Sequence, residues 1–428
     1  MKIVRGLSYK EVLQKPRKKA KKPTRPSFFF RTLIKILSIS DLSATNFKYK
    51  EIGMEKLSKK EPCLILMNHS SFIDLKIVNR VFYPRKYNIV CTGDGFIGRN
   101  WLMRQIGCIP TKKFVNEISL IHDMGYAIKR YNSSILMYPE ASYSFDGTAT
   151  PLPESLGRCI KMMGMPVIVI ISDGAYLRDP LYNNLQLRKT DVSATVEYLL
   201  SPEEIKTMSP KEINAMLAER FSFDNWKSQQ ERGVEITEPF RADYLNRVLY
   251  KCPHCMAEGK TEGKGTELIC HACGKKYELD TKGFMRALEG ETEIPHIPDW
   301  YKWERECVRE EILKGEYSLD VEVDIYAMID TKCIYAVGEG RLIHNREGFH
   351  LTGCDGELDY VHKPLASYSL YADYYWYKLG DMICIGDKDI LYYCFPKNCG
   401  DVVAKTRLAT EELYKIVRAE RRNARTEE

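Results

Sequence analysis

Short apolar runs alternate with stretches of helical period between residues 61 and 190 of the 428-residue chain. The apolar runs cover residues 63–67, 89–91, 134–138 and 167–171. Runs of this length without polar alternation are typical of strands that are buried on both faces, and the stretches between them are long enough for helices. The pattern therefore predicts an α/β layer structure for this part of the chain.

The pattern changes beyond residue 286, where polar and apolar residues alternate with period two. Segments rich in Tyr, Val and Ile predict strands; they cover residues 321–325, 333–337, 348–351, 367–377 and 383–393, with a hairpin at 382–393. Helical periods flank them at 299–313 and 410–422. We therefore expect residues 286–428 to form a helix and a mainly β domain with a terminal helix, similar in architecture to a pleckstrin-homology-like barrel.

The first 60 residues carry the positive charge of the chain. They hold 17 Lys and Arg against 4 Asp and Glu, whereas the remaining residues hold 47 against 54. The apolar stretch 28–37 is much shorter than the roughly 20 residues that cross a bilayer. As a helix, this stretch separates Arg31 and Lys35 from one apolar face, which consists of Phe29, Phe30, Leu33, Ile34 and Leu37.

Such a helix beside the basic cluster 15–25 predicts binding to an anionic phospholipid membrane. Each basic residue near the surface contributes about 1 kcal/mol. We therefore expect residues 1–40 to form a basic arm with an interfacial helix, on a protein that is peripheral on the inner, cytoplasmic face of a membrane. The alternative is that the helix packs on the neighbouring domain and the arm is a solvated tail.

Two Cys-x-x-Cys pairs lie close together in the second half of the chain. Their cysteines are Cys252, Cys255, Cys270 and Cys273. Four thiolates at this spacing predict a tetrahedral zinc site, which has no open position and is therefore structural. We expect a zinc ribbon at residues 251–285, with His254 and His271 as bystanders. The other ten of the 14 cysteines show no disulfide framework, which favours a reducing compartment.

Candidate catalytic groups follow the first apolar run. His69 stands just after residue 67, and Asp74 comes five residues later. Sheets of α/β proteins place their sites at the carboxyl ends of strands. A carboxylate that holds one ring nitrogen leaves the other free to take a proton from a hydroxyl group. The pair therefore predicts a general base, His69, oriented by Asp74, although the same residues also suit a helix cap and a strand-end histidine.

The segment around this pair resembles the first motif of the glycerolipid acyltransferase superfamily, which includes the lysophosphatidic acid acyltransferases. The motif Asn-His-x-Ser-x-x-Asp is matched by Asn68, His69, Ser71 and Asp74. Three more motifs are similar and follow in the family's order, at residues 97–113, 137–144 and 165–168. The resemblance covers roughly residues 60–200. It implies an α/β domain over residues 41–250, with a mixed sheet flanked by helices.

The chain departs from the family in the third motif, where the resemblance implies substrate binding. Tyr143 stands in place of an arginine that helps to bind the acceptor's phosphate, and Ala141 replaces a glycine. A phenol carries no fixed positive charge. Either a cation of the second motif binds the phosphate, or the acceptor is not a lysophosphatidic acid; the candidate cations are Arg99, Lys112 and Lys113. The remaining residues expected to bind substrate are Asn68, Ser71, Glu140, Tyr143 and Ser144.

The resemblance implies direct acyl transfer in phospholipid synthesis, from acyl-CoA or acyl-carrier protein to a hydroxyl of a lysophospholipid-type acceptor. A serine nucleophile is disfavoured because the chain lacks a Gly-x-Ser-x-Gly motif. The departures at Ala141 and Tyr143 motivate the alternative of an inactive lipid-binding or scaffold protein. Nucleic-acid binding by the ribbon is disfavoured because glutamates offset its lysines. The partner of the C-terminal domain stays open.

Overall fold

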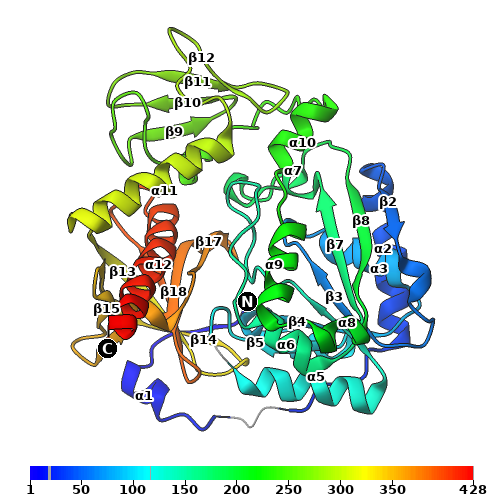
Figure 1. The fold of residues 1–428 in the computed structure, drawn as a ribbon. Coiled ribbons are helices and arrows are strands. Elements are labelled where there is room, and N and C mark those ends of the chain that lie inside the picture. Colours follow the sequence, from blue (N-terminus) through cyan, green and yellow to red (C-terminus); the bar gives the residue numbers. More distant parts are fainter. Residues whose placement is uncertain (18–20, 116, 428) are drawn as a thin grey trace.

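The predicted apolar strands lie at the centre of a seven-stranded sheet in the computed structural model, which describes residues 1–17, 21–115 and 117–427 (Figure 1). The strand order is β2-β8-β7-β3-β6-β4-β5. In that order the strands are Lys48–Ile52, Ser193–Leu200, Val167–Asp173, Leu64–Met67, Ser134–Met137, Tyr87–Thr92 and Cys108–Thr111. β7 and β8 pair antiparallel and the other neighbours pair parallel, so the expected mixed sheet is confirmed.

Helices cover both faces of this sheet. One layer consists of α2 and α3, and the other includes α5, α6 and α9; their bounds are Phe28–Ala44, Asp74–Phe82, Ile118–Tyr131, Leu156–Met163 and Pro210–Arg220. In the central strand β3, Ile65 and Met67 face the first layer, and Leu64 and Leu66 face the second. All four side chains are fully buried, as expected for a strand that is covered on both faces.

Helix α2 differs from the predicted interfacial helix in its length and orientation. It continues to Ala44 because Leu42 packs in the same apolar cluster as α3. Arg31, predicted on the solvent-facing polar side, is buried, and its guanidinium donates to the main-chain oxygen of Pro84 at 2.6 Å. The Arg31 side of the helix therefore lies against the protein, whereas Lys35 is exposed. None of the helices in the described ranges is long and apolar enough to cross a bilayer.

The N-terminal arm is bound to the C-terminal domain. β1 (Ile3–Val4) pairs with β14 (Ile334–Asn345), and α1 (Tyr9–Leu13) buries Val12 completely. The hydroxyl groups of Tyr9 and Tyr392 form a hydrogen bond of 2.6 Å. A solvated tail is therefore not what the structure shows for residues 1–13. In the basic cluster 15–25, residues 18–20 lie outside the described residues.

A separate four-stranded antiparallel sheet holds the two Cys-x-x-Cys pairs. Its order is β12-β11-β10-β9, with strands Met285–Ala287, Lys276–Leu279, Glu267–Cys270 and Thr261–Lys264. Tyr277 packs edge to face on Trp300 of α11 (Ile297–Lys314), with ring centroids 5.0 Å apart. The ribbon therefore shares an apolar core with α11, and its sheet ends at residue 287, slightly beyond the expected boundary.

The C-terminal region is mainly β, as expected. Its strand order is β16-β15-β14-β13-β19-β18-β17, and these neighbours pair antiparallel. Besides β14, the strands in chain order from β13 are Leu319–Met328, Gly348–Gly353, Leu358–His362, Tyr371–Trp376, Gly380–Gly386 and Leu391–Pro396. β18 and β19 form the predicted hairpin. The pleckstrin-homology-like identity stays a prediction.

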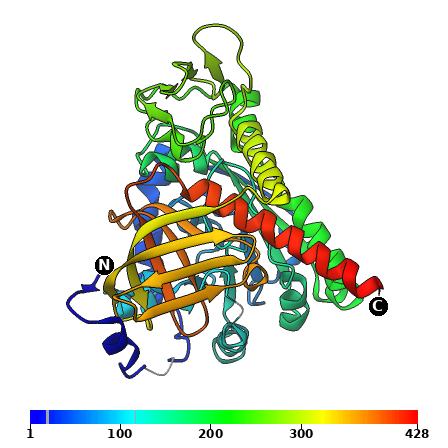
Figure 2. The same ribbon diagram turned by 90° about the vertical axis from the view of Figure 1, so that its left-hand side faces the viewer.

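The terminal helix α12 (Val403–Glu427) begins earlier than predicted. Its first turns bury Ala404 and Leu408, so the apolar face begins before residue 410. Figure 2 shows α12 crossing the C-terminal domain beside α11. The helix also contacts the α/β domain, because Arg418 forms an ion pair with Glu154.

Candidate active site

His69 lies in the loop after β3, at the carboxyl end of a strand in the middle of the sheet. Its Nδ1 is 2.9 Å from Oδ2 of Asp74, the first residue of α3. The same oxygen accepts hydrogen bonds from the backbone N–H groups of Ser70 (2.9 Å) and Ser71 (3.1 Å). A carboxylate fixed in this way favours the tautomer with a proton on Nδ1, which leaves Nε2 free to accept a proton.

Three polar residues of the motifs hold the loops of the site together. The Asn68 carboxamide accepts from the backbone N–H of Ser172 at 2.8 Å and donates to its oxygen at 3.0 Å, which ties β3 to β7. The Ser71 hydroxyl donates to Asp179. The Ser144 hydroxyl donates to the main-chain oxygen of Thr148 at 2.6 Å. Since these groups have internal partners, their predicted contact with substrate stays a prediction.

Glu140 supports the main chain of His69. One carboxylate oxygen accepts from the backbone N–H of His69 at 3.0 Å, and the other accepts from that of Thr150 at 2.7 Å. Glu140 is buried, and burial raises its pKa to about 7. The next residue, Ala141, has a φ of +58°, a left-handed conformation that costs a non-glycine residue about 1–2 kcal/mol. The glycine of the family motif avoids this strain.

Two tyrosines enclose the imidazole. The ring centroid of His69 lies 4.1 Å from that of Tyr138 and 4.2 Å from that of Tyr143, with interplanar angles of 23° and 31°. Burial lowers the pKa of His69, the hydrogen bond and charge of Asp74 raise it, and the charge of Lys113 lowers it. The net direction is downward, so the imidazole is neutral at neutral pH, as a general base must be.

The structure places the three predicted cations differently. Lys113 is half-buried, and its charge acts on the His69 ring. The Lys112 ammonium donates to the main-chain oxygen of Lys388 in the C-terminal domain. Arg99 is an exposed residue that precedes α4 (Asn100–Gln105). Lys113 is therefore the predicted cation whose charge reaches His69.

The C-terminal domain contributes residues to this site that the sequence analysis missed. Arg407 of α12 donates to the main-chain oxygen of Tyr143 at 3.3 Å. The charges of Asp373, on β17, and Asp94 act on Lys113. Arg407 and Tyr143 are 264 positions apart in the sequence, so no local pattern connects them.

The four predicted metal ligands lie together in the ribbon. Their Sγ atoms are all within 4.8 Å of one another, with 3.9 Å between Cys252 and Cys273 and 3.7 Å between Cys255 and Cys270. A Zn–S bond of about 2.3 Å in a tetrahedron requires a spacing of about 3.8 Å between sulfur atoms. The cluster thus fits one tetrahedral metal ion. His254 and His271 hydrogen-bond to glutamates at 2.9 and 2.7 Å, in agreement with a bystander role.

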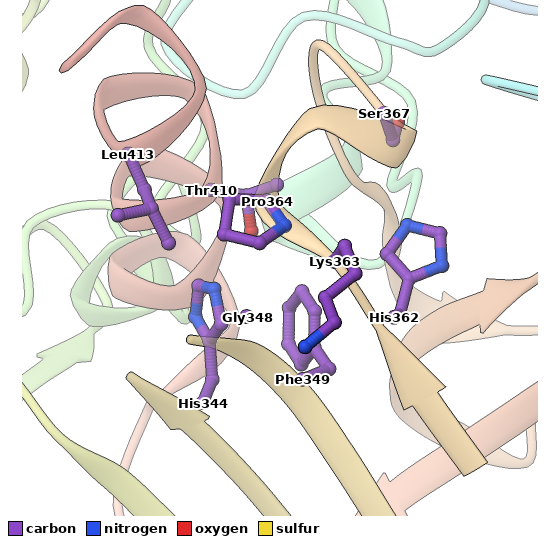
Figure 3. A pocket seen from close by; sticks show the side chains of 9 residues that line it. All are labelled: His344, Gly348, Phe349, His362, Lys363, Pro364, Ser367, Thr410 and Leu413. Atoms are coloured by element: carbon purple, nitrogen blue, oxygen red, sulfur yellow. The ribbon is translucent and has the colours of Figure 1, made fainter. Parts of the chain in front are cut away.

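A small cavity in the C-terminal domain contains two histidines but is a poor candidate site (Figure 3). His344 stacks on Phe349 with centroids 3.7 Å apart, and its Nδ1 is 2.9 Å from the hydroxyl oxygen of Tyr317. Burial lowers the pKa of His344 to about 3. The cavity measures about 10 Å³, enough for one water at most. His344 is therefore a packed, hydrogen-bonded core residue.

The fold and the site define an α/β domain that carries a histidine–aspartate pair at the carboxyl ends of its strands. Residues 48–172 match the Acyltransferase family. All four motifs lie within this range. The match confirms the resemblance to the glycerolipid acyltransferase superfamily over this part of the chain.

Two further comparisons add little to this assignment. A search of curated proteins finds no match. Among solved structures, the chain is similar to the 1-acyl-sn-glycerophosphate (LPA) acyltransferase PlsC from Thermotoga maritima, with 16% identity over 48% of this chain and 79% of that chain. The TM-score is 0.36, which is too low for the comparison to bear on function.

Proposed function

We propose that the protein transfers an acyl group from acyl-CoA or acyl-carrier protein to a hydroxyl of a lysophospholipid-type acceptor, as a step of phospholipid synthesis. The observation that carries the proposal is the 2.9 Å contact between His69 Nδ1 and Asp74 within the matched family domain. An inactive lipid-binding protein on the same fold has no need of an oriented, neutral histidine.

The reaction needs one general base and no covalent enzyme intermediate. Nε2 of His69 takes the proton of the acceptor hydroxyl while its oxygen attacks the thioester carbonyl. Collapse of the tetrahedral intermediate breaks the C–S bond, and the leaving thiolate takes the proton from the imidazolium. The products are the ester and the free thiol. Asp74 stabilises the imidazolium during this cycle, and Glu140 keeps the backbone of His69 in place.

The experiment that tests the proposal is acceptor-dependent release of free thiol. Palmitoyl-CoA and an acyl-carrier thioester are supplied with a panel of lysophospholipids and neutral monoacyl acceptors. Release that requires both an acceptor and His69 supports the proposal, and the product ester identifies the acceptor. Absence of turnover with every donor and acceptor, from a folded protein that still binds vesicles, would favour the inactive lipid-binding alternative.

The pH profile of acyl transfer is expected to show a neutral base with a lowered pKa. Since burial and Lys113 lower the pKa of His69, the rate should rise with pH and level off below histidine's usual value of about 6.5. Glu140 has a pKa raised to about 7 by burial, so Glu140→Gln is the control that removes a second ionisation. An inflection of kcat/KM well above the usual value in both proteins would contradict this role of His69.

We also propose that α2 binds the membrane surface. Five of its apolar side chains are more than half exposed: Phe28 (62%), Phe29 (66%), Ile36 (58%), Leu37 (61%) and Ile39 (61%). At the start of the helix, Phe30 packs on the exposed Trp101 with ring centroids 5.5 Å apart. Exposed apolar side chains over several turns, with the helix's buried arginine on the opposite side, suit insertion into the headgroup region.

Replacing Phe29 and Leu37 together with glutamate is expected to weaken binding to anionic phospholipid vesicles by about tenfold or more, because two inserted apolar side chains are lost. Vesicle co-sedimentation measures this. Met162→Glu is the matched control, since Met162 is 68% exposed on α6 in the opposite helical layer. Equal binding by both variants would show that α2 does not face the membrane.

A further inference from the structure

The C-terminal domain contacts Lys113, the predicted cation whose charge acts on His69. The Lys113 ammonium lies over the ring of Tyr371 on β17, 4.0 Å from its centroid. Burial lowers the pKa of Lys113, and the charges of Asp373 and Asp94 raise it. Tyr371 and Asp373 are two positions apart on a strand and therefore point to the same face. Lys113 thus contacts an aromatic ring of another domain, and the charge of a carboxylate on the same strand face acts on it.

Hydrogen bonds fix this strand against the acyltransferase domain. The Tyr371 hydroxyl donates to Oδ2 of Asp94 at 2.8 Å, and Nε1 of Trp376 donates to the same oxygen at 3.2 Å. Asp94 is a buried residue in the 3₁₀ turn Gly93–Phe96, directly after β4. Because both donors belong to β17, the position of Asp373 relative to Lys113 is set by the interface and not by a mobile loop.

Arg407, the second cation near the site, already has partners within the protein. The Arg407 guanidinium lies 4.4 Å from the ring centroid of Phe145 and forms an ion pair of 3.3 Å with Glu411. By contrast, Oδ1 of Asp373 and Oδ1 of Asp94 are buried without a hydrogen-bond partner among the described residues. Such oxygens accept hydrogen bonds from hydroxyl or ammonium groups and repel a phosphate. The unpaired carboxylate oxygens near Lys113 can therefore accept hydrogen bonds from donor groups, but they repel an anion.

His69, Tyr143, Lys113 and Asp373 are all half-buried, so each retains some access to solvent. From this arrangement we propose that Asp373 determines acceptor specificity: its negative charge offsets that of Lys113 and disfavours an acceptor with a phosphate monoester, in favour of a headgroup without net negative charge. Neutral glycerol and zwitterionic ethanolamine headgroups belong to this class. The inference rests on the proposed acyl transfer and revises its acceptor class, since monoacylglycerols, which carry no phosphate, are included beside zwitterionic lysophospholipids.

The test compares two acceptors that differ by one phosphate group, monooleoylglycerol and oleoyl lysophosphatidic acid. Assays at about pH 8 keep the Asp373 carboxylate ionised, because burial raises its pKa only to about 7. The native protein is expected to prefer monooleoylglycerol in kcat/KM. Asp373→Asn should shift the ratio about tenfold toward lysophosphatidic acid, mainly through KM, because the carboxylate no longer opposes the phosphate. In the double variant with Lys113→Met, this shift should disappear.

The matched control is Asp355→Asn, which changes an exposed aspartate in a turn of the same domain. A native preference for lysophosphatidic acid would overturn the inference, as would an equal loss of both activities in Asp373→Asn. Equilibrium binding of short-chain forms of both lipids to His69→Ala gives a readout that needs no turnover. If binding shows the preference and its shift but no acyl transfer occurs, the proposed reaction fails while the specificity of Asp373 stands.

Discussion

Replacing His69 with alanine is expected to lower acceptor-dependent thiol release by about 10²–10⁴-fold, the usual contribution of a general base. The imidazole is the group that the loop after β3 is built to hold, with Nδ1 on Asp74 and the backbone N–H on Glu140. Alanine keeps the backbone hydrogen bond and removes only the base. The loss should therefore appear in kcat with every acceptor, and the thermal unfolding temperature should change little.

Asp74→Asn keeps the base, His69, and changes only the group that orients its ring. The carboxamide can still accept from the backbone N–H groups of Ser70 and Ser71, but it no longer stabilises an imidazolium, so we expect a loss in the same direction. His122→Ala is the matched control, because His122 is an exposed histidine on α5. Acyl transfer that continues at a native rate without His69 would exclude this histidine as the base and require another mechanism for the domain.

The sequence predicts those parts of the molecule that depend on contacts between residues close together in the chain. The run at residues 63–67 is a buried strand, and His69 and Asp74 meet because a strand end and a helix start are joined by a short loop. The two Cys-x-x-Cys pairs likewise converge, one in the turn between the bridged residues Lys251 and Glu258 and the other in the turn between β10 and β11. In each case the functional side chains come from a few neighbouring residues or from one supersecondary unit, so their spacing in the sequence is enough to predict that they meet.

Contacts between distant segments could not be predicted in this way. Asp94 and Tyr371 are 277 positions apart, yet their hydrogen bond helps to build the surroundings of Lys113. The orientation of α2 was also missed, because Arg31 is buried through its bond to Pro84, far along the chain. Periodicity shows which residues share a face, but the packing partner decides which face turns inward.

Removing the metal ion that the four cysteines are predicted to bind is expected to have the second large effect, on the stability of the protein. Ribbon side chains such as Leu268 and Tyr277 belong to the same buried cluster as Trp300 of α11. Without a metal ion the sulfur atoms, which are 3.7–3.9 Å apart in the pairs Cys252–Cys273 and Cys255–Cys270, take up protons, and the stabilisation by metal–thiolate bonds is lost. Cys270→Ser should therefore abolish stoichiometric zinc and lower the free energy of unfolding by about 3 kcal/mol or more.

Zinc analysis of the purified protein and thermal unfolding with and without a chelator measure this effect. Cys399→Ser is the matched control, because Cys399 is an exposed cysteine outside the cluster. The ribbon core continues into α11, and α11 packs along α12. Loss of the metal should therefore loosen the packing that supports Arg407 and Asp373. Acceptor selectivity should then fall before the histidine–aspartate pair is disturbed. If the native protein contains no zinc and a chelator does not change its unfolding temperature, apolar packing alone stabilises the ribbon.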